Sequence, residues 1–312
     1  MNTQFTDSAR QNTAAIPADK PPQIPFLKFE AIVGRGGMAT VWRAWHRGIG
    51  RSVAVKILDP RFSASEEDVQ QFMTEVSIMS SLHHPGIVQG YGANYADGRY
   101  YFIMDYVTGY SFGAFLARKG SMRETDVLIA CECVADAMKY AWDDFSIVHC
   151  DIKPENIMVD GDGTIKVTDL GLCQSTAAIQ SVEQAEEVVG TPAYISPEQI
   201  YGDVKLDCRA DIYCLGASMY HMATGRTLFP IMNTDEILRA HVSEKIQAPD
   251  PRFVNPAISK GFACLVANMC VKDRDCRYGS WDEVLEDAKL VESGGVPAPL
   301  HEASVSSIQI NP

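Results

Sequence analysis

The strongest constraint on this chain of 312 residues is a short polar run, His149–Met158, which Asp169-Leu170-Gly171 follows closely. The run brings a carboxylate, an ammonium and an amide into one loop, and the second carboxylate stands beside a glycine that permits a sharp turn. Asp151 could accept a hydroxyl proton, and Lys153 could neutralise a migrating phosphoryl group. Asn156 and Asp169 could supply oxygen ligands to Mg²⁺. Each residue alone is more often simply solvated, so the prediction depends on their spacing.

A glycine-rich stretch lies upstream, in residues 32–41, between two segments that are typical of strands. Its small side chains would let backbone N–H groups approach phosphate oxygens. Glycine clusters usually mark ordinary turns, so this stretch alone is weak evidence. Its weight comes from the apolar segment Val53-Ala54-Val55-Lys56, which ends in a lysine that could contact phosphates.

The next segment predicts an amphipathic helix that carries an acidic partner for Lys56. Ser65 and Asp68 form a capping box, and apolar residues then recur at helical spacing. Glu75 lies beside the apolar stripe, where an unpaired carboxylate would be costly and a Lys56 partner would relieve that cost. The alternative is that Glu75 is a solvated helix residue. Three further helices are expected, with a capping box at Ser121 and Glu124, an end at Gly225, and a start at Ser280.

Together with residues 190–198, residues 210–216 and Arg277, these motifs resemble in type and order those of eukaryotic-type protein kinases, specifically the bacterial Ser/Thr branch. The resemblance implies an α+β, two-lobed fold, with a small β-rich lobe carrying one main helix and a larger, mainly helical lobe. It also implies that Arg277 pairs with Glu198. The expected boundaries are a disordered, proline-containing segment at 1–25, a kinase domain at 26–292 (small lobe 26–104, hinge 105–109, large lobe 110–292) and a flexible tail at 293–312.

The resemblance further implies transfer of the γ-phosphoryl group of ATP to a Ser or Thr hydroxyl of a protein, with Mg²⁺, or alternatively Mn²⁺, as the metal. In the hinge, the backbone at Asp105 and Val107 would pair with adenine, while Met104 gates the pocket behind it. The implied catalytic residues are Asp151, Lys153, Asn156, Lys56, Glu75 and Thr191, with Thr191 bridging Asp151 and Lys153 through its hydroxyl. The implied nucleotide-binding residues are Val33, Gly34, Gly36, Gly37, Val41, Ala54, Lys56, Met104, Asp105, Val107, Met158 and Asp169, and the implied metal ligands are Asn156 and Asp169.

The chain departs from the family pattern in four places. Ala39 replaces the third glycine, Leu170 a phenylalanine and Ser196 an alanine, and all three changes are tolerable. Cys150 stands where most regulated kinases have an arginine that pairs with a phosphorylated loop residue. We therefore expect that activation does not require phosphorylation of the loop between Asp169 and Glu198. The alternative is that another basic residue, such as Arg61, supplies the phosphate pocket.

The composition limits which partners and which location are expected for this chain. The net charge of −13 argues against a nucleic-acid partner, because phosphate binding needs a basic face. No apolar run approaches the ~18 residues of a membrane helix, and no signal peptide is evident, so a cytoplasmic location is expected. The nine cysteines form no C-x-x-C pair, which disfavours a zinc ribbon.

Two other functions remain open. One is a pseudokinase scaffold, disfavoured because Lys56, Glu75, Asp151, Asn156 and Asp169 are all present. The other is a small-molecule kinase of related fold, which would generally lack the Gly-Thr-Pro-x-Tyr-x-x-Pro-Glu segment at 190–198. The substrate and the oligomeric state do not follow from the sequence.

Overall fold

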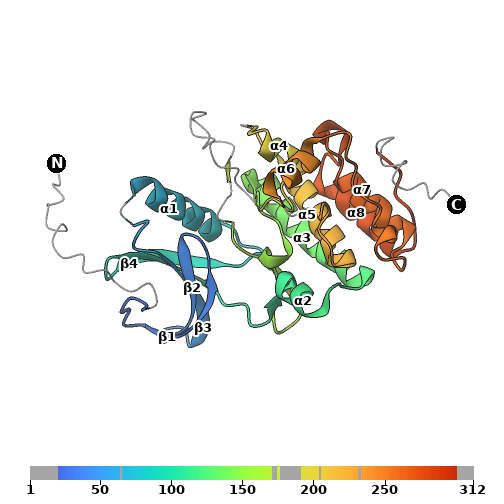
Figure 1. The fold of residues 1–312 in the computed structure, drawn as a ribbon. Coiled ribbons are helices and arrows are strands. Elements are labelled where there is room, and N and C mark those ends of the chain that lie inside the picture. The colour runs from blue at the N-terminus through green and yellow to red at the C-terminus, as the bar shows by residue number, and fades with distance from the viewer. Residues whose placement is uncertain are drawn as a thin grey trace. The chain divides into compact units, whose positions relative to one another are not determined.

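The computed structural model describes residues 20–63, 65–170, 174–175, 191–203, 205–230 and 233–300. The chain divides into two compact units. Unit 1 comprises the residues up to Val76 together with Gly90–Tyr106, and unit 2 comprises Ser77–Gln89 together with the residues from Val107 onward. Unit 1 is rich in strands and contains the start of one helix, whereas unit 2 is mainly helical (Figure 1). The α+β class expected from the sequence is therefore confirmed.

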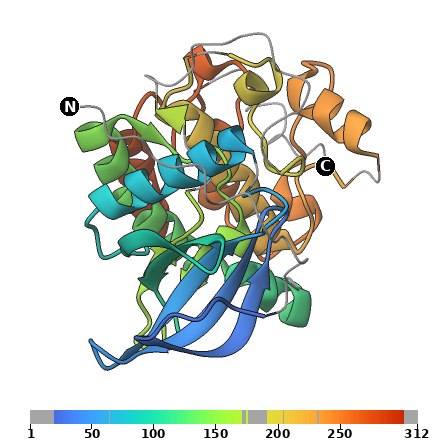
Figure 2. The same ribbon diagram turned by 90° about the vertical axis from the view of Figure 1, so that its left-hand side faces the viewer.

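Unit 1 is built on a five-stranded antiparallel sheet with the strand order β1-β2-β3-β5-β4. Figure 2 shows these strands side by side, with helix α1 lying across one side of the sheet. The elements are β1 (Leu27–Arg35), β2 (Ala39–His46), β3 (Arg51–Leu58), α1 (Glu66–Ser81), β4 (Gly90–Ala96) and β5 (Arg99–Asp105).

The central strand β3 separates the two faces of this sheet. Val53, Val55 and Ile57 alternate along it and are all buried in one hydrophobic cluster, which Ile24 and Leu27 also join. The intervening residues, among them Lys56, point to the opposite face because successive side chains of a strand alternate. One face of the sheet thus forms a core, and the other carries a charged group.

Helix α1 begins as its sequence predicts. The Ser65 hydroxyl oxygen accepts a hydrogen bond from the backbone N–H of Asp68 at 3.2 Å, so this part of the expected cap is confirmed. Acidic residues fill the first turn, where the helix dipole favours negative charge. Phe72, Val76 and Met79 are buried at helical spacing.

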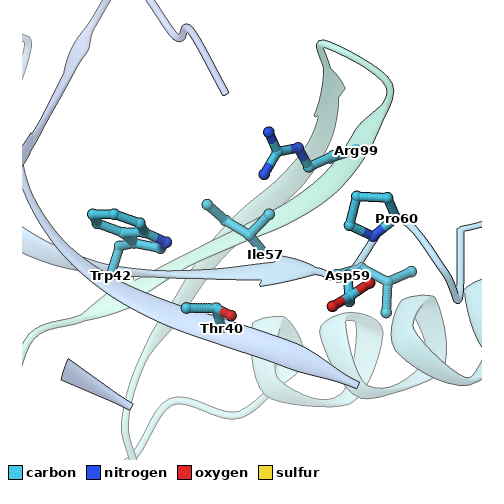
Figure 3. A pocket seen from close by; sticks show the side chains of 7 residues that line it. Thr40, Trp42, Ile57, Asp59, Pro60 and Arg99 are labelled. Atoms are coloured by element: carbon cyan, nitrogen blue, oxygen red, sulfur yellow. The ribbon is translucent and has the colours of Figure 1, made fainter. Parts of the chain in front are cut away.

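A small hollow on the core face of unit 1 contains a buried arginine (Figure 3). Arg99 is only 3% exposed, and burial lowers the pKa of its guanidinium. Thr40, Trp42 and Asp59 line the same hollow. Its volume of about 10 Å³ has room for about one water molecule, so this hollow is too small for a nucleotide.

Unit 2 contains most of the helices and two small sheets, β6-β8-β9 and β10-β7. Helix α5 is buried almost all round, and it packs against α3 and α7, while α8 packs against α3 and α7 (Figure 1). The elements are β6 (Tyr110–Ser111), α2 (Phe112–Lys119), α3 (Glu124–Phe145), β7 (Ile147–Val148), η1 (Pro154–Asn156), β8 (Ile157–Val159), β9 (Ile165–Val167), β10 (Gln174–Ser175), α4 (Pro197–Ile200), α5 (Cys208–Thr224), α6 (Thr234–Val242), η3 (Pro251–Phe253), α7 (Lys260–Met269), η4 (Arg274–Cys276) and α8 (Trp281–Glu292).

Of the three helix boundaries expected from the sequence, the end at Gly225 and the start at Ser280 are confirmed, and the start at Ser121 is wrong. Gly225 ends α5 with a φ of 72°, and the Ser280 hydroxyl accepts from Glu283 N–H at the start of α8. Helix α3, however, has Arg123 as its N-cap, without a capping side chain. The Glu124 carboxylate that the capping box would need instead accepts hydrogen bonds from the backbone and hydroxyl of Ser259, at 2.6 and 2.7 Å.

The segment 293–300 lies against α7, although the sequence suggested a flexible tail from residue 293. Asn268 donates to the carbonyl of Ala298 at 2.9 Å and accepts from the N–H of Leu300 at 3.1 Å. The Cys264 thiol lies 3.1 Å from the carbonyl of Pro297. A buried asparagine therefore satisfies the backbone of a segment whose Gly and Pro content alone suggested a loop.

Candidate active site

A buried ion pair in unit 1 joins the sheet to helix α1. Lys56 Nζ lies 2.6 Å from Glu75 Oε1, and the two side chains are 16% and 8% exposed. The strand pattern directs Lys56 away from the core face, and the cap at Ser65 fixes the helical phase of Glu75. Burying either charge alone would be costly, so each group stabilises the other. The expected contact is confirmed, and its part in nucleotide binding stays a prediction.

The residues expected around the nucleotide in unit 1 share the face of the sheet that carries Lys56. Lys56 stands directly opposite Val41 across the β2–β3 pair, and Val41 stands opposite Gly34. Ala54, two residues before Lys56, stands opposite Met104 across the β3–β5 pair, and both are buried. Directly opposed residues of an antiparallel pair project to the same face. The expected nucleotide-binding residues of this face therefore combine one ammonium with small and apolar side chains.

The turn between β1 and β2 contains Gly36 and Gly37, and it is closed by a hydrogen bond from Gly36 N–H to the Ala39 carbonyl at 2.8 Å. An added Cβ at Gly37 would meet nothing within 4 Å, and neither glycine has a positive φ. The local fold therefore does not itself demand glycine at Gly37. A ligand that needs close backbone approach would explain it. Val33, on β1 before this turn, is 47% exposed.

In unit 2, four of the predicted catalytic residues form one hydrogen-bonded cluster. Lys153 Nζ lies 2.7 Å from Asp151 Oδ2, and the Asn156 amide donates to Asp151 O at 2.9 Å and to the same carboxylate oxygen, Oδ2, at 3.1 Å. The Thr191 hydroxyl donates to Asp151 Oδ1 at 2.8 Å and accepts from Lys153 Nζ at 2.6 Å. The predicted Thr191 bridge is therefore confirmed as a contact.

Helix α5 holds the loop that carries Asp151. Asp211, 1% exposed, accepts the backbone N–H groups of His149 at 2.6 Å and Cys150 at 2.8 Å. Burial raises the pKa of Asp211 to about 6, and these two backbone donors partly offset it. The Ser218 hydroxyl donates to the carbonyl of Ile152 at 3.1 Å. Three hydrogen bonds from two residues of one buried helix thus fix the loop backbone.

Two residues of this region have left-handed backbone angles, with φ of 65° at Cys150 and 58° at Asp169. Such angles are uncommon outside glycine and are kept where the surrounding bonds enforce them. The N–H bond of Cys150 to Asp211 and the bond from Gln199 Nε2 to its carbonyl, at 2.7 Å, enforce the first. The sequence motif at residues 210–216 resembles the start of a helix that anchors this loop, whereas the bond from Gln199 was not expected, because Gln199 lies far from Cys150 along the chain.

The predicted metal ligands Asn156 and Asp169 come from adjacent segments of unit 2. The N–H of Thr168, next to Asp169, donates to the carbonyl of Asn156 at 3.0 Å. The amide nitrogen of Asn156 makes both hydrogen bonds to Asp151, and no described residue donates to the side-chain oxygen of Asn156. The described residues contain no cluster of three or more His, Cys, Asp or Glu side chains suited to a metal. One carboxylate and one amide fit Mg²⁺, which usually takes its other ligands from water and substrate phosphates.

Val107 and Met158, the remaining expected nucleotide contacts in unit 2, lie outside this cluster. Val107 is buried, and Met158 lies on β8 opposite Lys166 and Ser111.

Cys150 is 2% exposed and packs in an apolar cluster with Val148, Leu206 and Ala210. Among the described residues, the side chains of this cluster carry no positive charge for a phosphorylated residue. Arg61, the alternative from the sequence, is bound to Asp59 through two hydrogen bonds of 3.0 and 3.1 Å.

The segment after Thr191 is anchored by a second buried ion pair. Arg277 contacts Glu198 through both guanidinium nitrogens, at 2.7 and 3.2 Å, and its side chain is completely buried. The expected pairing is confirmed. The Tyr194 hydroxyl also lies 2.7 Å from His221 Nδ1, so the segment is held at more than one point.

Comparison with known proteins identifies the family of this chain. Residues 27–288 match the family model of the protein kinase domain, so the chain belongs to the protein kinase family. It is 31% identical to the serine/threonine-protein kinase PrkC of Bacillus subtilis, over 83% of this chain and 39% of the relative. It is 33% identical to the serine/threonine-protein kinase PknB of Mycobacterium leprae, over 85% of this chain and 43% of the relative.

The chain spans about two fifths of the length of these curated relatives. Within the part that the structure describes, no helix combines the length and the apolar character needed to cross a membrane.

Proposed function

We propose that this chain transfers the γ-phosphoryl group of Mg²⁺-bound ATP to Ser or Thr hydroxyls of proteins. The observation that carries the proposal is the cluster of Asp151, Lys153, Asn156 and Thr191, which joins a potential base, a cation and a metal ligand by hydrogen bonds. Membership of the kinase family supports the reaction class.

Asp151 would orient the acceptor hydroxyl and take its proton as the new O–P bond forms and the bond to the leaving diphosphate breaks. The Thr191 hydroxyl and the Asn156 amide hold the two carboxylate oxygens, so the base is oriented before the acceptor arrives. Lys153, bound to Asp151, places an ammonium where it would offset charge on the transferred group. Bound Mg²⁺-ATP supplies the phosphoryl group and a metal that neutralises its charge.

The proposed nucleotide contacts are a lysine, a glycine-rich turn and two oxygen ligands for the metal. Lys56, oriented by Glu75, would contact phosphate oxygens, and the backbone at Gly37 can approach them because no side chain intervenes. Asn156 and Asp169 would hold the metal through oxygen atoms.

A protein acceptor is supported by the residues that follow Thr191. This segment contacts the catalytic aspartate at one end and ends in the buried Glu198–Arg277 pair at the other. Such fixed backbone beside the base would hold an extended peptide. A small-molecule kinase has no need for it.

The test is to incubate the purified chain with radiolabelled ATP, Mg²⁺ and separate acceptors. These are a general protein acceptor, matched peptides with Ser, Thr or Tyr as the only hydroxyl residue, and an aminoglycoside. We expect label on the protein and on the Ser and Thr peptides. Label on the aminoglycoside alone would favour a small-molecule kinase, and ATP binding without any transfer would favour a pseudokinase scaffold.

A further inference from the structure

A β-bulge on strand β4 directs one tyrosine toward the end of β5. Gly90 pairs with Met104 and Gly92 with Ile103, so Tyr91 is an extra residue without an opposing partner. Gly92 has a φ of 140°, which only glycine adopts readily. A bulge re-aims the side chain that it carries. Here it places the Tyr91 hydroxyl against the carboxylate of Asp105, to which it donates a hydrogen bond.

Arg51 completes this network from strand β3. Its guanidinium lies over the Tyr91 ring, 4.7 Å from the ring centre, and also donates to the Tyr91 hydroxyl. The same guanidinium lies 3.6 Å from Asp105 Oδ1. Burial, followed by the contact with Asp105, raises the pKa of Tyr91 to about 12, so its hydroxyl keeps the proton that it donates. Three strands thus meet at one carboxylate.

Asp105 is the last residue of β5 and stands directly opposite Val53. Its side chain therefore projects to the core face of the sheet, whereas that of Met104 projects to the face of Lys56. The network contacts Asp105 through its side chain on the core face, and the peptide groups of Asp105 lie at the end of the strand. The next residue, Tyr106, is held in a similar way, since Arg43 lies 5.8 Å from its ring centre and is paired with Glu30 at 2.9 Å.

We propose that Arg51 and Tyr91 are positioning residues that fix the Asp105 backbone and so set the preference for adenine over guanine. The proposal rests on the proposed function and on the expectation, implied by the family resemblance, that the backbone at Asp105 pairs with adenine. Adenine and guanine differ in the donors and acceptors that they present to a backbone. A strand end held in one position discriminates between them, because the wrong base leaves polar groups unpaired.

The test compares Tyr91→Phe with the matched control Tyr95→Phe. Tyr95 lies on the same strand, is 54% exposed, and its hydroxyl makes no hydrogen bond to a described residue. For each protein, ATP and GTP binding are measured directly by calorimetry with Mg²⁺, and KM and kcat are measured with a protein acceptor. In Tyr91→Phe we expect the KM for ATP to rise about 3- to 10-fold, with kcat within about twofold and GTP binding nearly unchanged.

These changes lower the ratio of ATP affinity to GTP affinity in Tyr91→Phe. The same decrease of the ratio is expected for Arg51→Gln, while Tyr95→Phe should match the wild type. An unchanged ratio in both Tyr91→Phe and Arg51→Gln would overturn the inference. So would an equal loss of ATP and GTP affinity, which would indicate a merely structural role. If the wild type binds ATP selectively but transfers no phosphoryl group, the proposed function fails while the binding ratios still decide this inference. A wild type that binds neither nucleotide overturns both.

Discussion

The buried His241 should make the stability of this protein depend steeply on mildly acidic pH. Its ring is fully buried, and Nδ1 lies 2.7 Å from the Tyr213 hydroxyl oxygen, within hydrogen-bond distance. Phe229 packs edge-on at 4.9 Å, and the ammonium of Lys272 lies nearby. Burial and then the charge of Lys272 lower the pKa of His241 from 6.5 to about 4, and the carbonyls of Pro192 and Ala193 only partly offset this.

The sign follows from proton uptake. Between pH 6.5 and pH 4 the unfolded chain binds a proton at this histidine and the folded chain does not, so the free energy of unfolding falls as the pH falls. Each pKa unit corresponds to about 1.4 kcal/mol, so the full contribution, present above pH 6.5, is about 3 kcal/mol. Roughly 2.5 kcal/mol of it should be lost by pH ~4.5.

The assay is urea unfolding of the wild type and of His241→Gln from pH 7.5 to pH 4.5. The glutamine amide can hydrogen-bond with the Tyr213 hydroxyl but does not titrate. Asp211, whose raised pKa of about 6 gives the opposite pH dependence, is present in both proteins, so it cancels in the difference. We expect the stability advantage of the wild type over the variant to shrink by about 2.5 kcal/mol toward the acid end.

A matched control is His83→Gln, which removes an exposed histidine and should leave the pH dependence of the wild type intact. If the difference between the wild type and His241→Gln changes by less than about 0.5 kcal/mol over this pH range, the reasoning from burial is refuted.

Three further outcomes are expected. Arg277→Leu should lower the free energy of unfolding by about 3–5 kcal/mol in urea titration, because it leaves the Glu198 carboxylate buried and unpaired, and an unchanged midpoint would contradict this. Asp169→Ala should abolish the Mg²⁺-dependent part of the thermal stabilisation by ATP, because Asn156 cannot replace its charge, and full retention would exclude Asp169 as a ligand. Replacing the hydroxyl residues of the loop by Ala and dephosphorylating the protein should leave turnover near normal, whereas a collapse in activity would favour a phosphate-dependent loop. The replaced residues are Ser175, Thr176 and Ser181, whose side chains lie outside the described residues.

Local signals in the sequence were enough for much of the fold. The Ser65 cap, the apolar spacing of α1 and the apolar segment that forms β3 each depend on neighbouring residues, and all three occur in the structure. The prediction of a capping box at Ser121 was wrong because Glu124 is bound by Ser259, 135 residues away. A partner so distant along the chain cannot be recognised from the residues near Ser121.

The contacts of the candidate site also divide into those that were expected from the sequence and those that were not. Contacts between motif residues, such as Lys56 with Glu75 and Thr191 with Asp151, followed from the family resemblance. The bond from Gln199 to the Cys150 carbonyl did not, because it joins a side chain to a backbone atom of a distant loop. The direction of the Tyr91 side chain depends on a β-bulge, and the one-residue register shift of a bulge cannot be recognised from the sequence pattern of a strand.

The most direct test of the central claim is phosphoryl transfer by Asp151→Asn. This substitution keeps the shape of the side chain and removes its ability to take the hydroxyl proton. With radiolabelled ATP, Mg²⁺ and a protein acceptor, we expect turnover to fall by about 10² to 10⁴, while the ATP affinity measured on the same preparation stays within about threefold of the wild type. Wild-type turnover in this variant would contradict the assignment of Asp151 as the base.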